Sequence, residues 1–144
     1  MKKWFMVVIL EILIFMWLAD SKSYICISFL WVILHEFTHI LVANKFGCKF
    51  NNFYVSVWGT KAELSDIDEL TEKRKLILYA SGPFFNIFIA IVTAFFNDYF
   101  KYEFISNSTA INLCLGFFNL LPAYPLDGAR ICEILLSKKF LYKI

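Results

Sequence analysis

Four long stretches of mostly apolar residues dominate the sequence. They cover residues 4–19, 24–43, 76–96 and 104–121, and the last continues irregularly to about residue 136. A helix needs about 20 apolar residues to cross a hydrocarbon layer of ~30 Å, so each stretch predicts a transmembrane helix. The sequence therefore predicts an all-α polytopic membrane protein with about four transmembrane helices, built as one membrane-embedded domain over residues 1–144.

The first stretch has a second interpretation as a cleaved signal peptide, because Lys2 and Lys3 precede an apolar run that ends at Ala19. Signal peptidase cleavage needs small residues at positions −1 and −3 before the cut. With Ala19 at −1, the −3 position is Trp17, which is large. Glu11 also interrupts the apolar run. We therefore expect a retained helix.

A polar segment, residues 44–75, separates the second and third stretches. Residues 53–58 are β-branched and aromatic, Gly59 and Thr60 suit a turn, and residues 61–64 can return as a second strand. This pattern predicts a small cytoplasmic-side β-hairpin, which offers an edge strand to an extended peptide or anchors at the interface through Tyr54 and Trp58. Residues 65–75, charged and without Gly or Pro, predict a helical lead into the third stretch.

Composition supports the membrane interpretation. Hydrophobic residues make up 60% of the chain and charged residues only 18%, whereas a soluble domain has about half and a quarter. Seventeen Phe and four Trp exceed what a small globule can bury, so the lipid bilayer is the expected surroundings. The net charge of +2 gives no indication of nucleic-acid binding, and we expect none. The four cysteines have no C-x-x-C spacing and suit buried apolar positions.

The basic residues predict the orientation, because Lys and Arg accumulate on the cytoplasmic side. With the N-terminus in the cytoplasm, only Lys22 and Lys101 of the fourteen basic residues lie outside. The others are all inside: Lys2, Lys3, Lys45, Lys49, Lys61, Lys73, Arg74, Lys75, Arg130, Lys138, Lys139 and Lys143. We expect a multi-pass protein of a bacterial cell membrane with both termini cytoplasmic.

Ionisable side chains in a membrane helix are costly unless they pair, bind a metal or face water. The second stretch holds three of them within His35-Glu36-Phe37-Thr38-His39, including the only two histidines of the chain. Imidazoles at i and i+4 share one helical face and suit joint coordination of zinc, and the glutamate between them can activate a metal-bound water. The alternative is a pair of hydrogen-bonded core histidines, which would leave three desolvated groups without a metal.

A catalytic zinc usually has three protein ligands, and Asp127 is the best-placed further candidate. Pro122 and Pro125 must interrupt the fourth helix just before it, and broken backbone at membrane depth is tolerated where it lines a polar cavity or is buried in protein. Gly128 allows a close bend. Asp127 could equally cap the helix that follows. In the predicted orientation, the two histidines and Asp127 all lie toward the cytoplasmic side.

These motifs resemble those of the site-2 protease family, M50, of intramembrane zinc metalloproteases. The resemblance comprises His35-Glu36-x-x-His39, the segment Ser81-Gly82-Pro83-Phe84-Phe85-Asn86, and Asn119-x-x-Pro122-x-x-Pro125-Leu126-Asp127-Gly128, in the family's order. The last is similar to the branch of stage IV sporulation intramembrane proteases. Thr38 and Ala129 stand where that family commonly has glycine.

The resemblance implies that His35, His39 and Asp127 bind Zn²⁺ and that Glu36 is catalytic. It also implies that Asn86 and Asn119 face the site and bind the substrate carbonyl or oxyanion, although either amide could instead join helices. Asn112 is interpreted as structural.

The expected function is hydrolysis of a peptide bond in or near a transmembrane segment of a membrane-tethered regulatory protein. The substrate would be a single-span or hairpin membrane protein, and the sporulation branch implies a sigma-factor precursor and an inhibitory membrane partner. An anti-sigma factor or a signal-peptide remnant is an alternative substrate. A catalytically silent zinc-binding membrane chaperone or partner-binding protein of the same fold is the alternative function, but it would not need Glu36. A metal transporter would distribute its charged groups through several helices.

Overall fold

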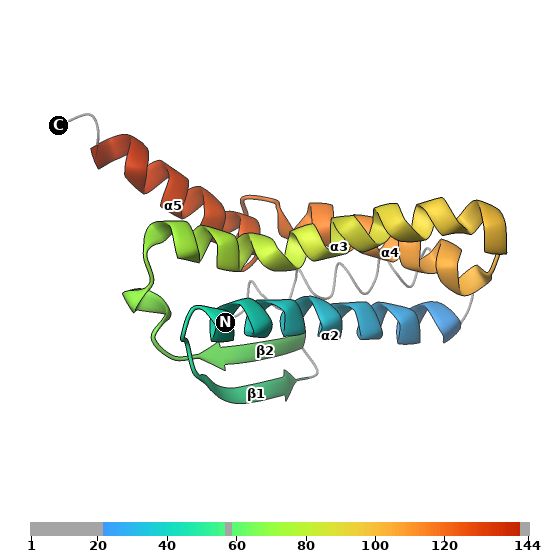
Figure 1. The fold of residues 1–144 in the computed structure, drawn as a ribbon, viewed down its shortest axis with the longest axis horizontal. Helices are drawn as coiled ribbons and strands as arrows, with labels where there is room; N and C mark the ends of the chain where they lie inside the picture. The colour runs from blue at the N-terminus through green and yellow to red at the C-terminus, as the bar shows by residue number, and fades with distance from the viewer. Residues whose placement is uncertain (1–21, 57–58, 142–144) are drawn as a thin grey trace.

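A computed structural model describes residues 22–56 and 59–141 of the chain (Figure 1). The predicted first transmembrane helix, residues 4–19 with Glu11, lies outside the described residues. The described part is mostly helical. Its long helices are α2 (Lys22–Lys45), α3 (Glu72–Phe100), α4 (Glu103–Asn119) and α5 (Asp127–Leu141).

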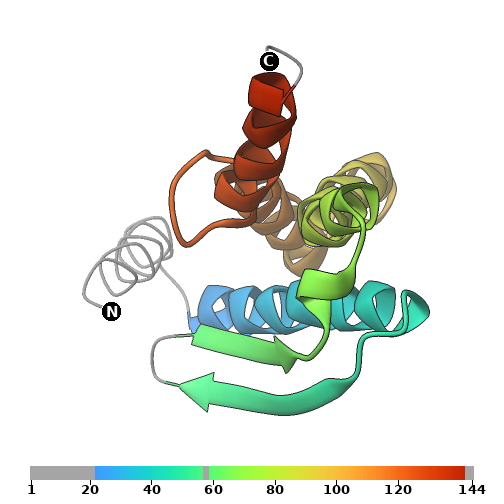
Figure 2. The same ribbon diagram turned by 90° about the vertical axis from the view of Figure 1, so that its left-hand side faces the viewer.

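Helices α2, α3 and α4 lie side by side along the long axis of the molecule, and α5 leads away from one end of this bundle (Figures 1 and 2). α3 runs antiparallel to both α2 and α4, and it packs against all three other helices. As a result, α3 is the central element from which a shared site can be built.

Two described helices are long and apolar enough to cross a membrane, at Tyr24–Lys45 and Glu72–Phe100. They contain the predicted second and third transmembrane segments. The predicted fourth segment is also helical, but α4 has only 17 residues. At 1.5 Å per residue it is about 25 Å long, because the prolines that follow end it early.

Local backbone chemistry fixes where α2 ends and where α3 begins. Gly47 has a φ of 90° just after α2, where Cys48 N–H donates to the Ala43 carbonyl at 3.0 Å. Glycine adopts this left-handed conformation without steric cost. At the start of α3, the Thr71 side chain accepts a hydrogen bond from Arg74 N–H, which is an N-cap.

Between α2 and α3 the chain forms strands β1 (Phe50–Ser56) and β2 (Gly59–Leu64), paired antiparallel with Ser56 opposite Gly59. Gly59 and Thr60 are therefore strand residues, and the prediction that they form the turn is wrong. The continuous helical lead predicted over residues 65–75 is also wrong. A 3₁₀ turn, η1 (Ile67–Glu69), ends at an extended Leu70. Thr71 is also extended, because an N-cap residue has a non-helical backbone, so no helix continues from η1 into α3.

Buried polar side chains and exposed large apolar side chains are both numerous in the described part of the chain. An apolar cluster of Ile27, Trp31, Ile111 and Leu115 joins α2 to α4. Many large apolar side chains nevertheless point outward, and Phe88 and Ile91 of α3 are 62% and 64% exposed. Polar side chains instead lie inside, among them His35, His39, Asn86, Ser108 and Asn112. This arrangement suits a lipid environment, where the polar groups must find partners within the protein.

The break between α4 and α5 returns the chain to the bundle. Residues 120–126 form a loop that contains both prolines, and α5 begins at Asp127. A Cβ atom at Gly128 would overlap the backbone carbonyls of Leu120 and Leu121, so only glycine permits this close approach. The corner places the first residue of α5 against α2.

Candidate metal centre

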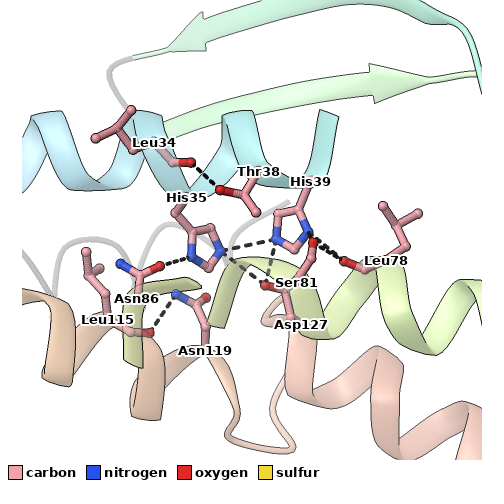
Figure 3. Close-up of polar contacts among 10 residues, drawn as sticks. All are labelled: Leu34, His35, Thr38, His39, Leu78, Ser81, Asn86, Leu115, Asn119 and Asp127. Atoms are coloured by element: carbon pink, nitrogen blue, oxygen red, sulfur yellow. Dashed lines mark hydrogen bonds and ion pairs between the residues drawn. The ribbon is translucent and has the colours of Figure 1, made fainter. Parts of the chain in front are cut away.

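Two histidines one turn apart on α2 form the first part of the site. His35 and His39 are 5% and 8% exposed, and their ring centroids lie 4.9 Å apart. Their Nε2 atoms are 3.2 Å apart and point toward the same volume (Figure 3). The i, i+4 spacing predicts this shared orientation.

Asp127 completes the cluster from the start of α5. Its Oδ2 atom lies 3.2 Å from His35 Nε2 and 3.1 Å from His39 Nε2. The structure thus brings together the three side chains that the sequence predicts as metal ligands. Asp127 begins α5, yet its carboxylate is directed at the imidazoles, as the metal-ligand interpretation requires (Figure 3).

The other nitrogen of each imidazole is already occupied. His39 Nδ1 lies 2.8 Å from the Leu78 carbonyl oxygen, and His35 Nδ1 lies 2.6 Å from Asn86 Oδ1. A carbonyl oxygen can only accept, so these contacts assign the proton to Nδ1 on both rings. Each Nε2 atom then presents a lone pair to the cluster.

The donor set fits a zinc ion. Two nitrogen lone pairs and a carboxylate oxygen converge at 3.1–3.2 Å with no proton between them, which only a cation or protonation can reconcile. Zinc–ligand bonds of about 2.0–2.1 Å at tetrahedral angles give ligand separations of about 3.3 Å. The observed spacing therefore matches three corners of a zinc tetrahedron.

Gly82 of α3 allows the third helix to lie directly against this cluster. A Cβ atom there would come within 2.7 Å of His35 Nε2 and still closer to His39 Nε2. Ser81, the preceding residue, donates its hydroxyl to the Leu78 carbonyl at 2.7 Å and has its oxygen 3.2 Å from His39 Nδ1. Ser81 and Gly82 therefore allow α3 to pack closely against the His39 ring.

The remaining predicted site residues occupy different positions. Glu36 follows His35 on α2 and is half-buried. Asn86 is fully buried, and its Oδ1 faces His35 while its Nδ2 donates to Asn112 at 2.9 Å. Asn119 donates to the Leu115 carbonyl of its own helix at 3.0 Å (Figure 3). The substrate-binding roles of these two asparagines stay predictions.

Sequence reasoning missed two contributions to the site. The Leu78 carbonyl orients His39. Every residue has a backbone carbonyl, so the sequence does not indicate which one contacts the histidine. Asn112 was interpreted as structural, but it lies directly behind Asn86. The signal that could have identified it was its polarity, since a fully buried amide in an apolar helix requires a partner.

Fold and site together define a protein with a candidate metal site and two helices long and apolar enough to cross a membrane, in which a His-x-x-x-His face meets an aspartate at a proline-broken corner. Comparisons with known proteins agree. The model of Peptidase family M50 matches residues 101–143, which include Asp127. A zinc metalloprotease of Methanocaldococcus jannaschii is 34% identical over 119 residues, covering 79% of this chain and 34% of that protein. Stage IV sporulation protein FB of Bacillus subtilis is 27% identical over 124 residues, covering 84% of this chain and 42% of that protein.

The chain is therefore similar to peptidase family M50, the site-2 protease family, with the family model matching residues 101–143. It spans less than half the length of these two relatives. The similarity to a zinc metalloprotease supports zinc as the metal that His35, His39 and Asp127 would hold.

Proposed function

We propose that this protein is an intramembrane zinc metalloprotease that hydrolyses a peptide bond in or near a transmembrane segment of a membrane-tethered regulatory protein. The convergence of His35 Nε2, His39 Nε2 and Asp127 Oδ2 at 3.1–3.2 Å carries this proposal. Both imidazoles donate from Nδ1, so this convergence consists of lone pairs that a metal cation would reconcile. The similarity to peptidase family M50 and the glutamate within the motif support a hydrolytic role.

The residues would divide the chemistry as follows. His35, His39 and Asp127 hold the metal, which when bound polarises a carbonyl and makes water a better nucleophile at neutral pH. Glu36 accepts the proton of the attacking water and passes it to the leaving amine. A substrate helix must first unwind, because an intact helix engages its carbonyls in internal hydrogen bonds. Asn119 is proposed to bind the unwound substrate.

The proposed topology has four crossings with both termini in the cytoplasm and the site toward the cytoplasmic side. The distribution of basic residues supports it, and the antiparallel course of α2 and α3 is consistent with it. His35 and His39 lie in the C-terminal half of α2, which this topology places nearer the cytoplasm. Water can then reach the site without crossing most of the bilayer.

The hairpin is proposed to receive the substrate. β1 and β2 form a two-stranded sheet, so each strand has one edge free of partners within that sheet. β2 also lies against α2, which carries the histidines. An extended substrate could add to such an edge through backbone hydrogen bonds, which place few demands on its sequence.

The substrate class is proposed from the motif resemblance to the sporulation branch, and the chain is similar to stage IV sporulation protein FB. We propose a membrane-tethered precursor of a transcription factor, such as a sporulation sigma factor, with an inhibitory membrane partner restraining the protease. Release of a soluble regulator would couple proteolysis to gene expression.

The test is co-expression of the full chain with a single-span reporter whose transmembrane segment contains helix-weakening residues. Wild type should release the cytoplasmic reporter domain, and Glu36→Gln should lower release at least about 100-fold, the scale of a lost general base. Zinc content, measured on purified protein, should be the same for both. Stoichiometric zinc without cleavage by wild type would indicate the silent binding protein. Undiminished cleavage by Glu36→Gln would refute the role of this glutamate.

A further inference from the structure

A chain of buried hydrogen bonds leads from the metal centre to the backbone of α4. Asn112 Nδ2 donates to the Ser108 carbonyl at 2.9 Å, and Asn112 Oδ1 accepts from Asn86 Nδ2 at 2.9 Å. Asn86 Oδ1 in turn contacts His35 Nδ1 at 2.6 Å. Side chains of Asn86 and Asn112 are completely buried, so water cannot replace these partners.

The direction of this chain is fixed at its far end. The Ser108 carbonyl can only accept, so the Asn112 amide must direct Nδ2 toward it and Oδ1 toward Asn86. Asn86 must then direct Nδ2 toward Asn112 and Oδ1 toward His35. The only arrangement that satisfies every link places the proton of His35 on Nδ1 and leaves Nε2 free for a cation.

We infer that Asn112 is a positioning residue that acts through Asn86 to hold His35 in its metal-binding tautomer. This inference rests on the proposed zinc site but not on proteolysis. Reversal of the Asn86 amide would place its NH₂ group against His35 Nδ1 and favour the tautomer with the proton on Nε2. That tautomer cannot coordinate through Nε2.

His39 provides an internal contrast. Its Nδ1 atom contacts the Leu78 carbonyl directly, without an intervening amide that can reverse. His35 instead depends on two amides in series. We therefore expect changes at Asn112 to affect His35 and to leave the tautomer of His39 unchanged.

A hydrogen bond from Trp31 anchors the relay. Trp31 Nε1 donates to Ser108 Oγ at 3.0 Å, and Trp31 lies one turn before His35 on α2. α2 and α4 are therefore tied at Ser108 beside the start of the relay. This contact fixes the position of Ser108 relative to the histidine that the relay serves.

The principal experiment measures the zinc dissociation constant of purified full-length variants by chelator competition. Asn112→Leu should weaken zinc binding about 10–100-fold, the usual effect of losing a residue that supports a ligand. Thr109→Val is the matched control, because Thr109 Oγ1 donates to Thr93 Oγ1 at 2.9 Å and links the same two helices outside the relay. It should leave zinc affinity unchanged. Equal losses in the two variants would reduce Asn112 to a helix-packing role and overturn the inference.

A second background separates tautomer control from packing. In Asn86→Asp both side-chain oxygens accept, so His35 Nδ1–H is satisfied whichever way the group is turned. Adding Asn112→Leu should then cause little further loss, about twofold at most, because residues that act through one contact have coupled effects that do not add. The inference is wrong if Asn112→Leu costs as much in this background as in wild type.

Wild-type protein gives an independent test that needs no foldable variant. The chain has only two histidines, so ¹⁵N-histidine labelling yields two imidazole spectra. At a pH where both imidazoles are neutral, metal-free protein should show a proton on Nδ1 of His35. A proton on its Nε2 would contradict the inference. Failure of wild type to bind zinc would instead refute the proposed function, which keeps the two outcomes distinct.

Discussion

The close approach of Gly82 to the histidines gives a quantitative prediction for Gly82→Ala. The added Cβ would lie 2.6 Å from His35 Cε1 and 2.7 Å from His35 Nε2. Ordinary van der Waals contact begins near 3.4 Å, so the His35 ring must retreat by about 0.7–0.8 Å or α3 must move. Metal–ligand distances tolerate only about ±0.2 Å. We expect zinc affinity to fall at least about 10-fold.

Stability should change less than metal binding in this variant. Alanine improves helix propensity by about 1 kcal/mol over glycine, which offsets part of an overpacking cost of about 1–3 kcal/mol. Gly116→Ala is the matched control, because its Cβ would meet Ile87 Cγ1 at 2.7 Å, away from the imidazoles. Gly116→Ala should therefore alter the melting temperature of metal-free protein without changing the zinc dissociation constant.

The assay compares zinc dissociation constants by chelator competition and melting temperatures without metal, for wild type and both alanine variants in one detergent. A Gly82→Ala protein that binds zinc within threefold of wild type would refute the proposed contact between α3 and the metal centre. A similar affinity loss in Gly116→Ala would show that general bundle packing, not ligand displacement, controls binding.

Three further predictions follow from single contacts. Asp127→Asn should lower zinc stoichiometry, measured by metal analysis after dialysis; unchanged stoichiometry would leave this residue only the role of a helix cap. Trp31→Phe should destabilise the fold by about 1 kcal/mol through loss of its buried bond to Ser108, and an unaltered unfolding midpoint would contradict this. The Glu133 carboxylate accepts a hydrogen bond from Tyr124 and so raises the pKa of that phenol. Because this contact stabilises the protonated phenol and is lost as pH rises through its raised pKa, Glu133→Gln should move one tyrosine step of an ultraviolet titration to lower pH.

Local spacing made the histidine part of the site predictable from sequence, because i, i+4 positions share a helical face wherever the helix lies. Asp127 is 92 positions from His35. Its proximity depended on two prolines ending α4 and on Gly128 permitting a tight corner, and the motif resemblance was needed to choose it over a simple cap.

Other features depended on how helices rotate against one another, which sequence periodicity does not determine. Asn86 and Asn119 both occupy motif positions, yet the structure directs Asn86 at His35 and engages Asn119 with its own helix.

The turn assigned to Gly59 and Thr60 was misplaced because pairing register decides where a hairpin reverses. The break before α3 was missed because the capping role of Thr71 outweighed the helical propensity of the charged residues around it.

The corner that carries Asp127 also has a consequence for biosynthesis. Both imidazoles are translated and can enter the bilayer long before the carboxylate that joins them has left the ribosome. Until then only two of the three candidate ligands are present, so the donor set is incomplete. The complete metal site, and with it the proposed hydrolytic activity, would thus arise only when Asp127 docks against the two histidines, after the earlier helices have been made.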